Sequence, residues 1–597
     1  MRALPQLLSR ALVVGIAAGV VPVACGAQQP QAPISTITAG TQLVVVDVTV
    51  QDSAGNPVRG LRGADFAVKE NKTPQTIKTF DEHTASDLSH IKAPPAIHLP
   101  PGTFTDYQPV PEDPTLNILL LDALNTPMKD QAYVRYQLQQ YIKNEKPGTR
   151  IAIFGLTNHL ILLQGFTADQ ETQAGASVGI VANVRKFYAD NAALQTQMRI
   201  DTTINAFDSM ARYLMAFPGR KNLIWFSGSF PLTIFPNPGL DDPFAAQNDA
   251  SDQLREASNL LARARVAVYP IDARGLQGLP MFDASHSGKA YAGDPSQTVK
   301  SISAVTTENE QEHMAMAQIA EDTGGHAFYS TNDLAAAVSK AIDSGSNYYT
   351  LTYAPTNRDP KGEYRSIQVQ LAEEFASRGL KITYRHGYYA DDPKARHPVS
   401  VVQATPAAAP PTGSQVSALN AMERGSPTPS EILFKVRVLP DEAGTEDAVA
   451  PGNHVNAYAN VKGPFRRYDL DFAAVASDFS FPLQSDGHRH SSIEFVAMVY
   501  DADGKVLNIQ GDVLDLDAAP DSYLKTLRSG IGYRIQVSAP AKRESFLRIG
   551  VHDQISGKMG VVEIPTTTID HLPAAPPLPR PAAATPPAAT PSPAVPK

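Results

Sequence analysis

The stretch Leu116-Asn-Ile-Leu-Leu-Leu-Asp122 decides the fold of the middle of this 597-residue chain. It is an apolar run with the length of a buried strand, and it ends in a carboxylate. Strand-like runs and helical patterns alternate repeatedly after it, as far as residue 345. This alternation predicts a mostly parallel sheet with helices on both faces, that is, a doubly wound, Rossmann-like α/β domain. We assign this domain to residues 115–345.

Short β-rich segments flank this domain on both sides. Residues 35–90 have the pattern of a β-meander and residues 346–393 carry further strands, but neither segment is large enough to bury a core alone. The ends of a domain often lie close together. We therefore expect the two segments to pair as one β-sandwich into which the α/β domain is inserted. A Pro-rich stretch, residues 91–114, is expected to be a simple connector.

The C-terminal third has a different composition. Residues 394–430 are rich in Pro, Ala, Ser and Thr, which predicts a linker. Spaced alternating runs over residues 431–568 predict a second β-sandwich of immunoglobulin-like type. The tail, residues 569–597, is rich in Pro and Ala and is expected to lack a packed core. The chain is thus predicted to be multidomain, with one α/β domain and β-sandwich domains around it.

The first 27 residues have the pattern of a secretory signal peptide, with a positively charged start, an apolar run and small residues at the exit. The apolar run is too short to span a bilayer. Cleavage after Ala27 would remove Cys25, the single cysteine of the chain. The alternative is a lipoprotein signal in which Cys25 carries a lipid anchor. We favour simple cleavage, because Pro22 stands where that signal usually has Leu. Both alternatives predict an exported protein of the periplasm, cell envelope or extracellular space.

Charge and motif content exclude several classes of function. The chain has 51 Lys and Arg against 60 Asp and Glu, a net charge of -9, and no basic stripe, which argues against nucleic acid as a partner. One cysteine excludes internal disulfides and cysteine-built zinc or iron–sulfur sites. No apolar run elsewhere in the chain reaches membrane length either. Walker A, H-E-x-x-H and G-x-G-x-x-G motifs are absent. We therefore expect a protein that is not an enzyme.

The order of several motifs resembles that of a von Willebrand factor A (VWA) domain. The matching pieces are Asp122 with Thr126, the strand at 222–226, the strand at 266–272, and Ala320-Glu-Asp-Thr-Gly-Gly-His-Ala-Phe-Tyr329, which resembles an "AxxTGGxxF/Y" element. With the valine-rich opening strand and Gly387-Tyr-Tyr389, the chain resembles the VWFA-related secreted proteins of Acidobacteria over residues 35–395. The resemblance implies a VWA-like fold and, since no biochemical activity is established for that family, no particular reaction.

The resemblance also implies a metal-dependent adhesion site (MIDAS) at the C-terminal edge of the sheet, where open α/β sheets bind ligands. In such domains a D-x-S-x-S motif, a loop threonine and a later aspartate hold a divalent cation, and the carboxylate of a partner completes its shell. Here Asp122 and Thr126 stand at the first and last motif positions, but Leu124 replaces the middle serine. Phe226-Ser-Gly-Ser229 replaces the usual T-D-G. The loop threonine is left open among Thr196, Thr202 and Thr203.

An all-oxygen ligand set suits Mg²⁺, and the loss of one hydroxyl and one carboxylate should weaken its binding greatly. We therefore expect a degenerate site and no resident cofactor, with Mg²⁺ held by Asp122 and Thr126 as the alternative. The other interpretation of Asp122 is that it hydrogen-bonds the loop that follows its strand. The residues expected to bind a ligand at this edge are Asp122, Asn125, Thr126, Ser227 and Ser229.

The leading functional expectation is a non-catalytic exported module that binds a protein ligand, in adhesion or envelope assembly. One alternative is a secreted hydrolase that uses Ser227 or Ser229, with His159 or His326 as the base. The other alternative is a purely structural spacer of the envelope.

Two short motifs imitate metal sites but favour hairpin turns. Asp486-Gly-His-Arg-His490 places two histidines two residues apart, without a third ligand nearby in the sequence. Asp501-Ala-Asp-Gly504 begins like a calcium loop but lacks the glutamate at the twelfth position.

Overall fold

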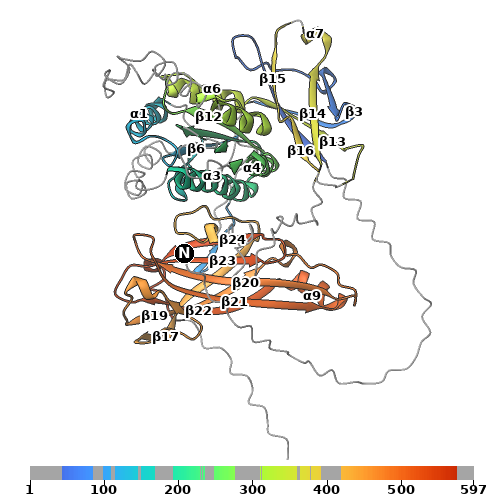
Figure 1. The fold of residues 1–597 in the computed structure, drawn as a ribbon. Helices are drawn as coiled ribbons and strands as arrows, with labels where there is room; N and C mark the ends of the chain where they lie inside the picture. The colour runs from blue at the N-terminus through green and yellow to red at the C-terminus, as the bar shows by residue number, and fades with distance from the viewer. Residues whose placement is uncertain are drawn as a thin grey trace, which may run out of the picture.

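The fold of the chain is that of a computed structural model, which describes residues 43–84, 99–108, 115–144, 149–167, 192–228, 230, 233–234, 248–249, 251–275, 309–310, 312–359, 363–376, 378–390 and 419–574. Within these residues six β-sheets form three units: the first β unit, the inserted α/β unit and the C-terminal β unit (Figure 1). The expected signal peptide with Cys25, and Ser229, lie outside the described residues. None of the described helices combines the length and the apolar character needed to cross a membrane.

The inserted α/β unit is built on a five-stranded sheet of order β12-β9-β6-β7-β8. Its strands are β6 (Leu116–Asp122), β7 (Ile151–Leu156), β8 (Leu160–Thr167), β9 (Lys221–Ser227) and β12 (Val266–Asp272). Strands β12, β9, β6 and β7 run parallel, and β8 pairs antiparallel with β7. Every residue of β6, β9 and β12 is buried. Burial on both faces explains why these strands are nearly continuous apolar runs.

Helices cover both faces of this sheet (Figure 1). They are α1 (Met128–Asn144), α3 (Ala192–Met215), α4 (Ser251–Arg263) and α6 (Leu334–Gly345), and the short strands β10 (Thr233–Ile234) and β11 (Asn248–Asp249) pair beside them. Ile118 and Leu120 of β6 enter a core shared with α3 and α4. Leu119 and Leu121 enter the opposite core, shared with α1 and α6. Successive side chains of this one strand thus pack into two different cores.

Two segments far apart in the sequence build the first β unit. Its elements are β1 (Val44–Gln51), β2 (Phe66–Glu70), β3 (Thr73–Gln75), β4 (Ile77–His83), β13 (Tyr348–Tyr353), β14 (Tyr364–Leu371), α7 (Glu373–Ala376), β15 (Lys381–Thr383) and β16 (Gly387–Tyr389). They form two four-stranded sheets, β15-β1-β13-β4 and β16-β14-β2-β3. Val46 lies opposite Leu351, and Val68 lies opposite Val369. All four residues enter one core between the sheets, so the α/β unit is inserted between the two halves of this unit.

The C-terminal β unit also consists of two sheets around one core. Their orders are β22-β19-β17-β5, in which β5 is Thr103–Thr105, and β18-β21-β20-β23-β24. Its elements are β17 (Phe434–Glu446), β18 (His454–Val455), β19 (Phe465–Ala474), β20 (Arg489–Tyr500), β21 (Val506–Ala518), α9 (Pro520–Ser529), β22 (Ile531–Pro540), β23 (Phe546–Asp553) and β24 (Met559–Pro565). Asp501 begins the turn between β20 and β21, where its N–H donates to Lys505 O at 3.0 Å. The hairpin predicted there is confirmed.

The stretch expected to be a simple connector, residues 91–114, carries a strand, and that expectation is corrected. Strand β5 (Thr103–Thr105) pairs antiparallel with β17 at the edge of a C-terminal sheet. The Asp106 carboxylate then accepts a hydrogen bond from Phe434 N at 3.0 Å. A threonine–phenylalanine–threonine sequence suits an edge strand once a partner strand is present. The segment therefore ties the N-terminal part of the chain to the C-terminal unit.

Two further boundaries of the C-terminal unit are corrected. The expected linker, residues 394–430, ends in packed structure, because Ala421 and Met422 are buried against the C-terminal unit. The tail expected to begin at 569 starts with Ile569, which is fully buried. Its neighbour Asp570 accepts a hydrogen bond from Tyr468 Oη at 2.6 Å. Apolar side chains at the ends of these Pro-rich stretches are drawn into the core.

Candidate functional site

Asp122, Asn125 and Ser227 come together at the C-terminal edge of the five-stranded sheet. Asp122 ends β6, and Ser227 ends the neighbouring parallel strand β9. The chain turns back directly after β6, so that Asn125 N donates to Asp122 Oδ1 at 2.8 Å. Parallel strands place their carboxyl ends at one edge, which explains why residues about a hundred positions apart meet there.

The carboxylate of Asp122 is satisfied by protein donors on both oxygens. Besides the contact from Asn125 N, Oδ2 accepts from Asn125 Nδ2 at 2.8 Å, Trp225 Nε1 at 3.0 Å and Ser227 Oγ at 2.9 Å. Three of the four donors thus share Oδ2, and one donates to Oδ1. Only 2% of Asp122 is exposed. Burial raises the pKa of Asp122, while the hydrogen bonds from Asn125, Ser227 and Trp225 oppose that shift.

Asn125 connects this carboxylate to helix α3. Its Nδ2 also donates to Thr203 Oγ1 at 2.8 Å, and its Oδ1 accepts from Arg199 Nε at 3.0 Å. The Thr203 hydroxyl donates to Arg199 O at 2.8 Å. Thr203, one of the three threonines left open by the sequence, therefore lies at this edge. Arg199 was not singled out by sequence analysis, although it stands one helical turn before Thr203 on the same face.

Thr126 joins the two loops at the sheet edge. Its Oγ1 accepts a hydrogen bond from Gly228 N at 3.1 Å. A Cβ at position 228 would lie 2.7 Å from Pro127 Cδ, so only glycine allows this close approach. The loop after β6 and the loop after β9 are thereby held together, next to the buried Asp122.

The donor set at this edge does not fit Mg²⁺. Both oxygens of Asp122 face N–H or O–H groups, and the amide group of Asn125 turns its Nδ2 toward that carboxylate. A hard cation needs oxygen lone pairs directed at it. The adjacent cavity of about 20 Å³ is lined largely by apolar side chains beside Asp122 and Thr126, and has room for about one water molecule. Among the described residues, no group of three or more His, Cys, Asp or Glu has a metal-holding arrangement.

The described residues of the hydrolase alternative, one serine and two histidines, each contact a partner outside that set. Ser227 is fully buried and donates its hydroxyl to Asp122, so its oxygen is not presented to solvent. His159 lies 3.9 Å from Glu423 of the C-terminal unit. His326 packs edge-on against the ring of Phe328. In this arrangement the Ser227 hydroxyl is a hydrogen-bond donor to Asp122.

A second polar cluster, which sequence analysis missed, follows the edge strand β12. Asp272 pairs in register with Ser227 of β9. Its Oδ2 lies 3.0 Å from an Arg274 terminal nitrogen and 3.1 Å from His313 Nε2. Arg274 also lies 2.7 Å from Glu312 Oε2. The available signal was that the strand 266–272, like the strand 116–122, ends in an aspartate.

The two histidines of the Asp486–His490 motif lie beside one carboxylate from the neighbouring strand β21. Asp517 Oδ1 is 2.7 Å from His488 Nδ1 and 3.5 Å from His490 Nε2. The hydrogen bond and charge of Asp517 raise the pKa of His488. The cluster is exposed at the end of a hairpin, which makes it an ion-paired turn in this structure.

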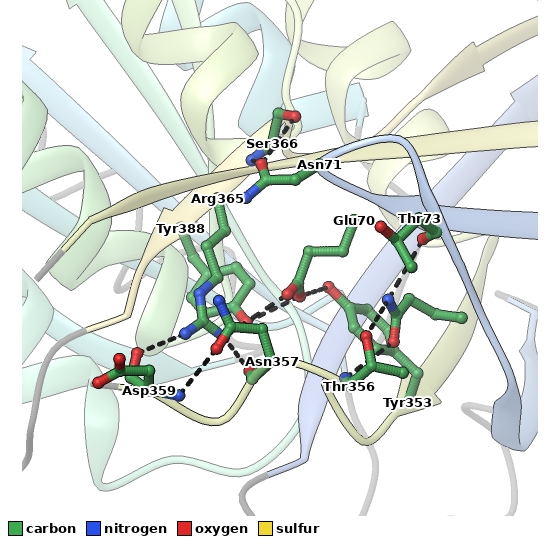
Figure 2. Close-up of polar contacts among 11 residues, drawn as sticks. Glu70, Asn71, Thr73, Tyr353, Thr356, Asn357, Asp359, Arg365, Ser366 and Tyr388 are labelled. Carbon is green, nitrogen blue, oxygen red and sulfur yellow. Dashed lines mark hydrogen bonds and ion pairs between the residues drawn. The ribbon is translucent and has the colours of Figure 1, made fainter. Parts of the chain in front are cut away.

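A buried charge network closes one end of the first β unit (Figure 2). Glu70 Oε2 accepts hydrogen bonds from Tyr353 Oη at 2.7 Å and Tyr388 Oη at 2.8 Å. Arg365 lies 3.5 Å from Glu70 Oε1 and also donates to the backbone oxygens of Asn357 and Asp359. Burial, followed by the hydrogen bond to Glu70, raises the pKa of Tyr388 to about 12. The network fixes the loop after β13 onto the sheet.

No protein-family model matches the chain, and no curated protein matches it. Among solved structures, an aerotolerance-related membrane protein from Bacteroides fragilis is similar to part of it, with 11% identity, coverage of 39% of this chain and 98% of that chain, and a TM-score of 0.23. The conserved hypothetical protein BatB from Bacteroides thetaiotaomicron shows 11% identity, coverage of 38% and 97%, and a TM-score of 0.22. The vWF domain of the type V pili tip protein Mfa5 from Porphyromonas gingivalis shows 15% identity, coverage of 21% and 42%, and a TM-score of 0.14. These likenesses are partial and distant, so the function of this chain is argued from its own residues.

Proposed function

We propose that the chain is an exported, non-catalytic protein-binding module of VWA-like fold, which acts in adhesion or envelope assembly without a bound metal. The fold part is supported by the parallel strands β12, β9, β6 and β7, with helices on both faces. The export part is supported by the leader pattern of residues 1–27. The observation that carries the binding part is the hydrogen-bond network that joins Asp122 to Arg199 through Asn125.

This network suggests how the edge works without a cation. In a metal-dependent edge, the metal receives the carboxylate of the partner. Here Arg199 brings a permanent positive charge to the same loop, because its Nε is held by Asn125 Oδ1. A guanidinium binds carboxylates through two parallel hydrogen bonds and does not lose its charge at neutral pH. The partner therefore presents an exposed aspartate or glutamate.

Helix α1, which begins just after this loop, adds apolar contact area. Met128 is 40% exposed and Tyr136 is 57% exposed. Aromatic residues, methionine and arginine are enriched in protein interfaces. The exposed Met and Tyr side chains of α1 match that composition and support a protein rather than a small-molecule partner.

The proposal is tested by capturing envelope proteins on the immobilised mature chain, with EDTA or with Mg²⁺. A specific partner should be retained equally in both buffers and lost with Arg199→Gln. Arg528→Gln, on the exposed helix α9 of the C-terminal unit, is the matched control and should retain it. Capture that EDTA abolishes, or that Arg199→Gln leaves unchanged, contradicts the proposal.

A further inference from the structure

Three arginines meet at the boundary between the first β unit and the inserted α/β unit. Arg220 and Arg265 directly precede strands β9 and β12, and Arg385 follows β15. With Asp47 of β1, they line a cavity of about 20 Å³. Lys221 is also buried at this boundary, where its Nζ donates to Ala264 O at 2.8 Å. The three arginines therefore outnumber the single carboxylate that lines the cavity.

Arg265 already engages that carboxylate. Its Nε lies 3.2 Å from Asp47 Oδ2, and a terminal nitrogen lies 2.8 Å from Asp47 Oδ1. The Thr350 hydroxyl donates to Asp47 Oδ1 as well, at 2.8 Å. A bidentate pair of this kind uses most of the acceptor capacity of the carboxylate. Asp47 therefore attracts Arg220 and Arg385 through space, while it accepts hydrogen bonds from Arg265 and Thr350.

Arg220 and Arg385 have only neutral partners at hydrogen-bond distance within the part of the chain that the structure describes. Arg220 donates to Gly324 O at 2.9 Å and Tyr269 Oη at 3.3 Å, and Arg385 donates to Val45 O at 2.7 Å. The Nε atoms of both arginines are buried without a hydrogen-bond partner. Arg220 as a whole is 2% exposed. An excess of buried positive charge, here three arginines around one carboxylate, and a buried donor without an acceptor both destabilise a fold.

We propose that this cavity binds one small monovalent anion, chloride in the native setting of the protein, between Arg220 and Arg385. An anion there would compensate the excess positive charge and accept from the unpaired N–H groups. The cavity volume corresponds to about one water-sized occupant, which excludes tetrahedral anions such as phosphate or sulfate. Arg220 belongs to the α/β unit and Arg385 to the first β unit. The bound anion thus joins the inserted unit to the unit that carries it.

The first test is thermal unfolding of the mature chain in sodium chloride and in sodium gluconate at equal ionic strength, followed by the fluorescence of Trp225. Chloride should raise the midpoint by a few degrees, and the increase should saturate with concentration. Arg385→Gln should remove the difference between the two salts. Arg437→Gln, which removes a cation paired with Asp471 on the C-terminal unit, should keep it. A chloride effect that Arg385→Gln leaves unchanged overturns the assignment.

The second test uses the unmodified chain, so it does not depend on the folding of a variant. Crystals grown with bromide in place of chloride should show an anomalous scattering peak between Arg220 and Arg385. A cavity that holds only water gives no such peak and equal midpoints in chloride and gluconate, and that result refutes the proposal.

Discussion

The substitution Asp122→Ala should destabilise the α/β unit strongly even when no metal is present. It removes the acceptor of four buried hydrogen bonds, donated by the Asn125 backbone, the Asn125 amide, Trp225 and Ser227. Each buried donor left unpaired costs about 1–3 kcal/mol. Relief of the buried carboxylate, whose pKa burial raises, offsets part of this cost. We therefore expect a loss of about 3–5 kcal/mol in the unfolding free energy of this unit.

The chain contains one tryptophan, which makes the measurement specific. Trp225 is fully buried and packs edge-on against Phe207, with the two ring centroids 5.0 Å apart. Urea unfolding followed by its fluorescence therefore reports on the α/β unit and not on the two β units. This separation matters because a chain of several units need not unfold in a single transition.

The matched control is Ser227→Ala, which removes one donor and leaves the carboxylate with three. Its expected cost is about 1 kcal/mol. A metal-ligand role for Asp122 predicts the opposite pattern, with Asp122→Ala harmless in EDTA and with Mg²⁺ stabilising only the wild type. Equal unfolding midpoints for the wild type and Asp122→Ala in EDTA would refute the structural role argued here.

Three further predictions concern the β units. Tyr353→Phe removes a hydrogen bond to the buried Glu70 carboxylate and should lower the stability of the first β unit by about 1.5–3 kcal/mol, measured by urea unfolding; Tyr458→Phe, at an 85% exposed position, should change nothing. Burial raises the pKa of Asp106 from 3.8 to about 7. Native Asp106 therefore binds a proton at pH values where the unfolded chain has lost it. The free energy of unfolding should fall as pH rises from about 4 to 7, by at most about 4 kcal/mol. Asp106→Asn should flatten that dependence in circular-dichroism unfolding curves, and an equally steep curve for the variant would contradict the assignment. The pKa of His488, measured by NMR titration, should lie above 6.5 because of Asp517, and Asp517→Asn should lower it; an unchanged value would show that the pair does not form in solution.

The parts of the fold that sequence analysis anticipated are those with a strong local signal. Strands β6, β9 and β12 are continuous apolar runs because both faces of their sheet are covered. Strand β5 was missed because three residues inside a Pro-rich stretch become a strand only through pairing with β17, which lies more than 300 residues away. Local propensity carries no information about a partner that distant in the sequence.

The candidate site, like the fold, could be predicted only in part from the sequence. Asp122, Asn125 and Ser227 could be grouped from the sequence because neighbouring parallel strands end at one edge. Their hydrogen bonds could not, since they depend on the side-chain orientation of Asn125 and on Trp225 within β9. Arg199 was missed because its role arises from the packing of α3 against the edge, where it reaches Asn125.

The central claim is that the sheet edge around Asp122 binds its partner without a metal. Calorimetric titration of Mg²⁺ and Mn²⁺ into the mature chain tests this claim most directly. The account predicts no saturable heat for the wild type, whose Asp122 carboxylate already accepts four hydrogen bonds. Saturable one-to-one binding that disappears in Asp122→Asn, with Trp225 fluorescence showing that this variant is folded, would contradict the account and establish a metal-dependent edge.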